Sequence, residues 1–186
     1  MIFSTCRKAH CSTRPGAPAS LALVALLALA VPACTPGSDA SSTARARIAD
    51  REAIEATLER YTRGLDRLDP VLYVSSFAAD GVLMIDAKKY QGHDALRAII
   101  AQEARLRQSQ QDSGQPPRTL FHLEGNSTIE LTSPAQALHR AYWLTASRAG
   151  ERPEGLSLLG VGSSTDELHK IDGKWLITRR EIRSQP

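Results

Sequence analysis

The sequence predicts an α+β domain, with helices in its first half and antiparallel strands in its second half. Two observations carry this prediction. Over residues 51–68 and 93–111, apolar side chains recur every three or four positions, which is the period of an amphipathic helix. After residue 118 the period changes to two, which is typical of strands. Because helices and strands are segregated along the chain, we expect three N-terminal helices packed on a curved antiparallel sheet. Such a sheet forms a cone around a pocket or stays flat and solid, and the periodicity is compatible with both.

Residues 1–33 have the pattern of a signal peptide. Three basic residues precede an apolar run from Ala19 to Val31, which is too short to span a bilayer as a permanent helix. The run ends at Ala33 and Cys34, so we expect either a bacterial lipoprotein with lipid on Cys34 or ordinary secretion after Ala33. Both alternatives predict an exported protein, either periplasmic and anchored in the membrane by the lipid or secreted and soluble.

The chain that follows this leader carries balanced charges. The whole sequence has 23 basic and 20 acidic residues, but the leader holds three of the basic ones and no acid. This balance gives no electrostatic basis for binding nucleic acid. The three cysteines are Cys6, Cys11 and Cys34, which excludes a disulfide framework in the mature domain. We therefore divide the chain into the leader (1–33), a polar, flexible tether (34–46) and one domain (47–186).

The first predicted helix covers residues 48–68. Its apolar positions share one face and are Ile54, Leu58, Tyr61, Leu65 and Leu68. Tyr61 brings a hydroxyl to that face, and Asp66 lies at its edge. Asp69 followed by Pro70 predicts the end of this helix and an N-cap with proline at the first position of the next.

The elements after this helix are assigned from the same patterns. We expect a short helix over residues 70–78, a strand over 82–87, a turn over 88–92 and a helix over 93–111. Long strands are expected over 118–131, 135–148, 156–171 and 174–183. The small residues Gly160 and Gly162 indicate a bulge or a close approach of two backbones, and Asp172-Gly173 predicts a hairpin turn. In the first long strand, alternation should place Phe121, Leu123, Ile129 and Leu131 on one face and His122, Glu124, Asn126 and Thr128 on the other.

Five ordered segments resemble the SnoaL-like branch of the nuclear-transport-factor-2-like (NTF2-like) superfamily. They cover nearly all of residues 47–183 in the expected order. The segments are Tyr61 with Gly64-Leu65-Asp66, residues 77–82 (FAADGV), residues 90–96 (YQGHDAL), His122 with Asn126, and residues 168–180 with the DGKWLI run and Arg180. The ordered set is specific to the fold and only weakly specific to an activity.

The resemblance implies a cone-shaped α+β barrel, often a homodimer through the outer face of its sheet. The superfamily includes cofactor-free dehydratases, ketosteroid isomerases and polyketide cyclases, and also members with no known reaction. In its dehydratase-like group a Tyr and an Asp of the first helix, a His of a strand and an Arg of the last strand meet in the pocket. Tyr61, Asp66, His122 and Arg180 match these four positions.

Each of the four matched residues has a catalytic and a structural interpretation. His122 suits proton transfer near neutral pH, or it lies on a wet strand face. Asp66 orients that histidine or acts as the acid or base itself, or it is a helix-end carboxylate paired with a neighbouring arginine in water. Tyr61 donates a hydrogen bond to the substrate or belongs to the core. Arg180 binds a carboxylate or an enolate oxygen, or it forms a solvated basic edge with the arginines near it.

Four further residues are candidates for ligand binding. They are Asn126, His139, Tyr142 and Trp143, although an aromatic strand is more often part of a core. We expect no metal site, because the histidines are scattered and no close pair has ligand spacing. We expect no cofactor, because there is no glycine-rich phosphate loop and no nucleophile elbow.

Two functions follow, from different classes. The first is a cofactor-independent lyase or isomerase of the dehydratase or ketosteroid-isomerase kind, acting on a small, largely apolar organic molecule by general acid–base chemistry. The second is a non-catalytic accessory lipoprotein of the cell envelope, which binds a small molecule or a partner protein.

Overall fold

The computed structural model describes residues 38–150 and 155–185. The predicted signal peptide, Cys34 and the start of the predicted tether lie outside these residues. None of the helices in the described ranges is long and apolar enough to cross a membrane.

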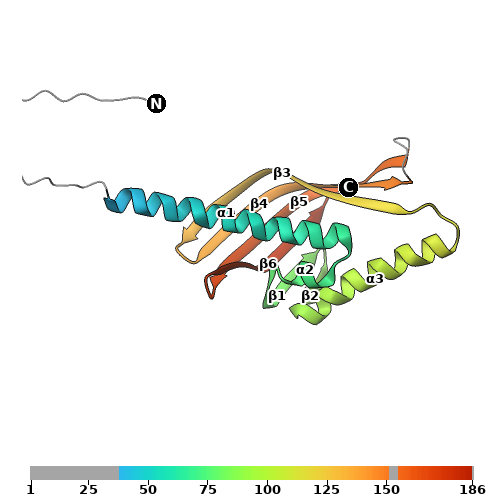
Figure 1. The fold of residues 1–186 in the computed structure, drawn as a ribbon, viewed down its shortest axis with the longest axis horizontal. Coiled ribbons are helices and arrows are strands. Elements are labelled where there is room, and N and C mark those ends of the chain that lie inside the picture. Colours follow the sequence, from blue (N-terminus) through green and yellow to red (C-terminus); the bar gives the residue numbers. More distant parts are fainter. Residues whose placement is uncertain (1–37, 151–154, 186) are drawn as a thin grey trace, which may run out of the picture. The chain divides into compact units, whose positions relative to one another are not determined.

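The described chain forms three helices and one six-stranded sheet, which confirms the predicted α+β class. The strand order is β2-β1-β6-β5-β4-β3, and the pairs are antiparallel except that β1 runs parallel to β6. The elements (Figure 1) are α1 (Ser38–Arg67), α2 (Pro70–Val74), β1 (Phe77–Ile85), β2 (Lys88–Gln91), α3 (Gly92–Asp112), β3 (Arg118–Ser133), β4 (Gln136–Ala149), β5 (Leu156–Ile171) and β6 (Lys174–Ser184).

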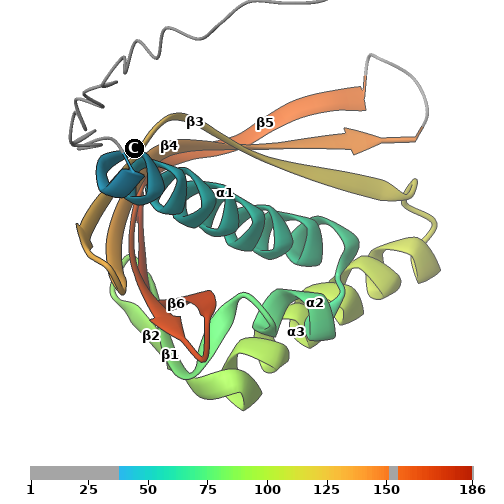
Figure 2. The same cartoon turned by 60° about the vertical axis from the view of Figure 1, so that its left-hand side comes forward.

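The sheet curves around α1 but does not close into a barrel. Figure 2 shows β3, β4 and β5 passing over one side of α1, while β6 and β1 turn down beside it and α2 and α3 lie at its C-terminal end. The sheet is therefore not flat, and its inner face is turned toward the helices.

Helix α1 begins at Ser38, earlier than the predicted start at Ile48. Residues 38–46, which were predicted to be a flexible tether, are helical. The reason is local: alanine and arginine favour a helix, and the acidic Asp39 lies in the first turn, where the helix dipole favours negative charge. From Asp39 to Ala49 this extension is exposed, so little packing constrains it.

The apolar face of α1 is buried as predicted, with Ile54, Leu58 and Tyr61 almost fully covered. Thr57 is also buried, and its hydroxyl donates to the backbone oxygen of Trp175 at 2.7 Å. A Cβ on Gly64 would lie 2.6 Å from the Cα of Tyr73, so only glycine lets α2 pack this closely against α1.

The connection from α1 to the sheet differs partly from the prediction. Asp69 caps α2 as expected, because its side chain accepts hydrogen bonds from the backbone nitrogens of Val71 and Leu72. The helix then ends at Val74 rather than near residue 78, and β1 already begins at Phe77. The predicted turn over residues 88–92 is mostly the edge strand β2.

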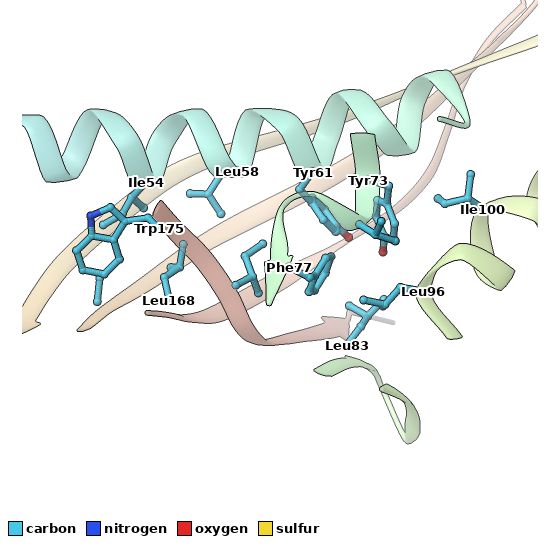
Figure 3. Close-up of a cluster of buried hydrophobic side chains, with 13 residues drawn as sticks. Ile54, Leu58, Tyr61, Tyr73, Phe77, Leu83, Leu96, Ile100, Leu168 and Trp175 are labelled. Atoms are coloured by element: carbon cyan, nitrogen blue, oxygen red, sulfur yellow. The ribbon is translucent and has the colours of Figure 1, made fainter. Parts of the chain in front are cut away.

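The core joins α1, α2 and α3 to the inner face of the sheet. Tyr61, Tyr73 and Phe77 form an aromatic cluster with ring centroids 5.1 to 5.9 Å apart. Figure 3 shows this cluster between Leu58 and Trp175 on one side and Leu96 and Ile100 of α3 on the other. The core therefore runs along α1 and stabilises the helix layer against the sheet.

A bulge in β3 changes which side chains point inward. Its pairing with β4 shifts register between Gly125 and Thr128, and Asn126 has a φ of 50°. Before the bulge His122 and Glu124 are partly buried while Phe121 and Leu123 are exposed, and after it Ile129 and Leu131 pack against the core. The prediction that these four apolar residues share one face is therefore wrong, because the extra residue reverses the alternation.

Candidate functional site

A cavity of about 220 Å³ lies between α1, α3 and the inner face of the sheet. Most of its wall is apolar, from Leu65, Ile85, Ile99, Leu123, Trp143 and Ile182. Its polar residues are Tyr61, Thr62, Tyr73, His122, Glu124, Thr145 and Arg180. An apolar space with a few converging polar groups is the usual form of a small-molecule site.

The end of α1 and the start of β3 bring Asp66 and His122 together. Asp66 Oδ1 lies 2.6 Å from His122 Nδ1 and accepts a second hydrogen bond from the backbone nitrogen of His122 at 3.1 Å. The two side chains are 26% and 23% exposed, so the pair stands at the boundary between protein and cavity. Asp66 thus turns inward and holds both the main chain and the ring of one residue.

This contact determines which ring nitrogen of His122 carries the hydrogen. An ionised carboxylate only accepts hydrogen bonds, so in the neutral imidazole Nδ1 must be the donor. Nε2 then carries the lone pair, and it makes no hydrogen bond to any described residue. A histidine arranged in this way is ready to take a proton.

Arg180 lies at the centre of a buried charged network. Its Nη1 donates to both oxygens of Asp166 at 3.0 and 3.1 Å, and its Nη2 is paired with Glu124 Oε1. Burial opposes the guanidinium charge, but the carboxylates of Asp166 and Glu124 outweigh burial and raise the pKa of Arg180. Within the described residues the Nε–H of Arg180 has no acceptor, which carries a cost in free energy. Arg180 is therefore not the solvated basic edge that was one of its two interpretations.

His139 belongs to the same network and not to the wall of the cavity. Its Nδ1 lies 2.7 Å from Asp166 Oδ2, and the residue is 1% exposed. Asp166 thus joins His139 of β4 to Arg180 of β6 across the inner face of the sheet. The position of His139 supports a structural role in place of the predicted ligand contact.

Tyr61 joins the network to the cavity. Its ring lies over the guanidinium of Arg180, with 4.1 Å between the ring centroid and Cζ. Burial raises the pKa of Tyr61 and the pKa of Tyr73, so both phenols keep their protons at neutral pH. In Figure 3 the two phenol oxygens lie near each other. Two neutral hydroxyls at the cavity wall are potential hydrogen-bond donors to a ligand oxygen.

The other three predicted ligand-binding residues are divided between two faces of the sheet. Trp143 lines the cavity, and its Nε1 donates to the backbone oxygen of Ser163 at 3.2 Å. A Cβ on Gly162 would lie 2.6 Å from this indole and closer still to the backbone oxygen of Arg183, and the second contact confirms the predicted close approach of two backbones in β5. Asn126 and Tyr142 instead line a groove of about 530 Å³ that also includes the exposed Leu144 and Val161.

Sequence reasoning missed two carboxylates of the site, Glu124 and Asp166. Glu124 was predicted to share the face of His122 and was given no role, yet its side chain is 16% exposed and lines the cavity. Asp166 is fully buried, and no local pattern singles it out. The small residues that precede it in β5 indicated a close approach in this strand, but they did not identify Asp166 itself. Among the described residues, no three His, Cys, Asp or Glu side chains are grouped to hold a metal ion.

Comparison with known proteins supports the fold described above. The family described as the SnoaL-like domain matches residues 46–181. No curated protein matches the chain.

Solved structures with the same fold include two proteins from Novosphingobium aromaticivorans. One is an NTF2-like protein with a cystatin-like fold, which is 19% identical with a TM-score of 0.64 over 79% of this chain and 90% of the other. The second is described as a candidate scytalone dehydratase and is 23% identical, with a TM-score of 0.59 over 77% and 89%. A third structure is hexachlorocyclohexane dehydrochlorinase LinA-type3 from Novosphingobium barchaimii, 18% identical, with a TM-score of 0.60 over 76% and 90%. At these identities the likeness shows a shared fold.

Proposed function

Because this chain belongs to the SnoaL-like domain family, we propose that it is a lyase or isomerase that works on a small organic molecule without a cofactor. One observation carries the proposal: the 2.6 Å contact of Asp66 with His122 Nδ1 leaves Nε2 unpaired beside an apolar cavity. The dehydratase and dehydrochlorinase names of two similar structures support elimination chemistry as the reaction class.

In the proposed mechanism His122 is the general base. Nε2 takes a proton from a carbon next to an electron-withdrawing group, and Asp66 stabilises the imidazolium that forms. In an elimination the electron pair of the broken C–H bond forms a double bond and the leaving group departs from the adjacent carbon. In an isomerisation His122 returns the proton to another carbon. A positioned base contributes about 10²–10⁴ in rate, or roughly 3–5 kcal/mol.

Tyr61 and Tyr73 are the proposed partners of a substrate oxygen. Both line the cavity, and burial raises the pKa of each phenol, so each keeps its proton. The two hydroxyls bond each other, which leaves one proton for a ligand oxygen. A carbonyl oxygen that gains negative charge as the proton leaves would accept from such a donor, which lowers the barrier. Arg180 contacts the ring of Tyr61 and helps to hold it in position.

The test is turnover of a small panel of β-hydroxy ketones and β,γ-unsaturated ketones in deuterated water, which separates elimination from isomerisation. His122→Gln should lower kcat by about 10²–10⁴ and leave the melting temperature nearly unchanged. His169→Gln, on β5, is the matched control and should keep full activity. Full activity of His122→Gln would remove this residue from the mechanism.

We also propose that a second copy of the chain covers the outer face of the sheet. This face carries an exposed apolar patch. It consists of the cross-strand neighbours Leu123, Leu144 and Val161 together with Tyr142. An exposed apolar patch of this kind is typical of an interface, and the family resemblance implies a dimer through this face. Sedimentation velocity should show a dimer for the natural sequence and a monomer for Leu144→Arg. A monomer at high concentration of the natural protein would contradict the proposal.

A further inference from the structure

We propose that Glu124 makes the cavity selective for neutral molecules that carry a hydrogen-bond donor, such as a hydroxyl group, and makes it reject carboxylates. This inference rests on the proposed function, because it assigns the substrate class of the same cavity. It departs from the expectation that Arg180 binds an acidic substrate.

The terminal nitrogens of Arg180 are not free to bind an acidic ligand. Both terminal nitrogens already have carboxylate partners, Nη1 with Asp166 and Nη2 with Glu124. The side chain is 2% exposed, and the ring of Tyr61 covers the guanidinium. A carboxylate ligand would therefore have to displace Glu124 from Arg180, and it would leave that carboxylate unpaired in a largely apolar wall.

The second step concerns the oxygens of Glu124. Oε1 is the oxygen that pairs with Arg180, while Oε2 accepts no hydrogen bond from any described residue. The side chain retains 16% exposure and lies two positions from His122 on β3. It lines the cavity and also borders the groove that contains Asn126 and Tyr142. A carboxylate oxygen that faces a cavity accepts hydrogen bonds and donates none, so it favours a ligand N–H or O–H group.

The third step concerns the charge around the cavity. Asp66, Glu124 and Asp166 contribute three negative charges, and Arg180 contributes one positive charge. The carboxylates of this group therefore outnumber its one guanidinium. The apolar wall screens this charge poorly, because the interaction of two charges grows as the effective dielectric constant falls. An anion is repelled, whereas a neutral molecule loses little on entering.

These steps also give an arrangement for the reaction. Glu124 and His122 lie on one wall, from β3, and Tyr61 and Tyr73 lie on the other, from α1 and α2. A molecule in this cavity can therefore meet the carboxylate of Glu124, the phenols and the imidazole of His122 from one position. Glu124 is thus a residue that determines specificity, while His122 takes the proton.

The experiment compares the binding of two probes of similar shape, 2-naphthol and 2-naphthoate, at pH 7 by calorimetry. The natural protein should bind 2-naphthol at least tenfold more tightly than 2-naphthoate. Glu124→Gln removes one negative charge and weakens the contact with Arg180, so 2-naphthoate should bind at least tenfold more tightly than before. Glu130→Gln, on the same strand but exposed and paired with Arg140, is the matched control and should keep the natural ratio.

The preference of the natural protein decides the matter even if Glu124→Gln does not fold. Equal or tighter binding of 2-naphthoate by the natural protein would overturn this inference and leave the role of His122 intact. An unchanged ratio in a folded Glu124→Gln would also overturn it. Failure to bind either probe would overturn both this inference and the proposal that the cavity is the ligand site.

Discussion

Two His–Asp pairs with nearly the same geometry occupy opposite environments in this molecule. His122 Nδ1 lies 2.6 Å from Asp66, and His139 Nδ1 lies 2.7 Å from Asp166. The first pair is about one quarter exposed, whereas the second is 2% and 0% exposed. The same chemical contact therefore stands once at a cavity and once inside the core.

The surroundings of each pair determine what it can do. Asp66 bonds His122 alone, and the second ring nitrogen of this histidine has no partner among the described residues. Asp166 is shared between His139 and Arg180, so its carboxylate neutralises a buried cation. The first pair is suited to moving a proton and the second to holding three strands together. A His–Asp contact alone is no evidence of catalysis.

The largest expected effect is on stability and comes from a change in the buried pair, Asp166 and His139. Asp166→Ala should lower the free energy of unfolding by about 3–5 kcal/mol, because it leaves Arg180 and His139 buried without their shared partner. Asp66→Ala, the same change in the open pair, should cost less than about 1 kcal/mol. Urea denaturation measures both values. Equal losses would mean that the two pairs do not differ as the structure indicates.

A smaller effect, on the rate of the proposed reaction, is expected when the pair at the cavity, Asp66 and His122, is changed. Asp66→Asn should lower kcat by about 10–100-fold, or about 1.4–2.7 kcal/mol, because a neutral amide stabilises the imidazolium less well and permits the other tautomer of His122. Glu59→Gln changes an exposed carboxylate of the same helix and is the control. If Asp66→Asn keeps the natural rate, orientation by Asp66 is not part of the mechanism.

The smallest effect concerns Tyr61, whose ring covers Arg180 and whose side chain lines the cavity. Burial raises the pKa of its phenol in the folded state, so its contribution to stability is complete below the unfolded value near pH 10. That contribution is lost as the pH rises from there through the higher folded-state pKa. Tyr61→Phe should therefore reduce the alkaline loss of stability, by about 1 kcal/mol, in urea denaturation at pH 9 to 11. Tyr142→Phe is the exposed control, and identical slopes for Tyr61→Phe and the natural protein would contradict the interpretation.

Local chemistry allowed much of the fold to be predicted from the sequence. The N-cap at Asp69, the buried face of α1, the bounds of β5 and the turn at Asp172-Gly173 all depend on residues close together in the chain. The sequence did not predict the start of α1, the early end of α2 at Val74 or the parallel pairing of β1 with β6. They depend on weak preferences or on partners distant in the sequence.

The sequence suggested some residues of the candidate site but not the contacts between them. Tyr61, Asp66, His122 and Arg180 came from the family resemblance, and the spacing of the first two gave no reason for them to converge. They do not converge on one point: Tyr61 covers Arg180, while Asp66 bonds His122. Asp166 could not be singled out, because its burial depends on His139 and Arg180 from two other strands.

The bulge at Asn126 has a consequence for how such a pocket could evolve. One inserted residue turns the strand segment with His122 and Glu124 inward without altering any of its side chains. A deletion of one residue there would turn the same segment outward and bring Phe121 to the inner face in place of His122 and Glu124. The insertion or deletion of a single codon could therefore change the polarity of this wall, whereas point substitutions would have to replace several side chains.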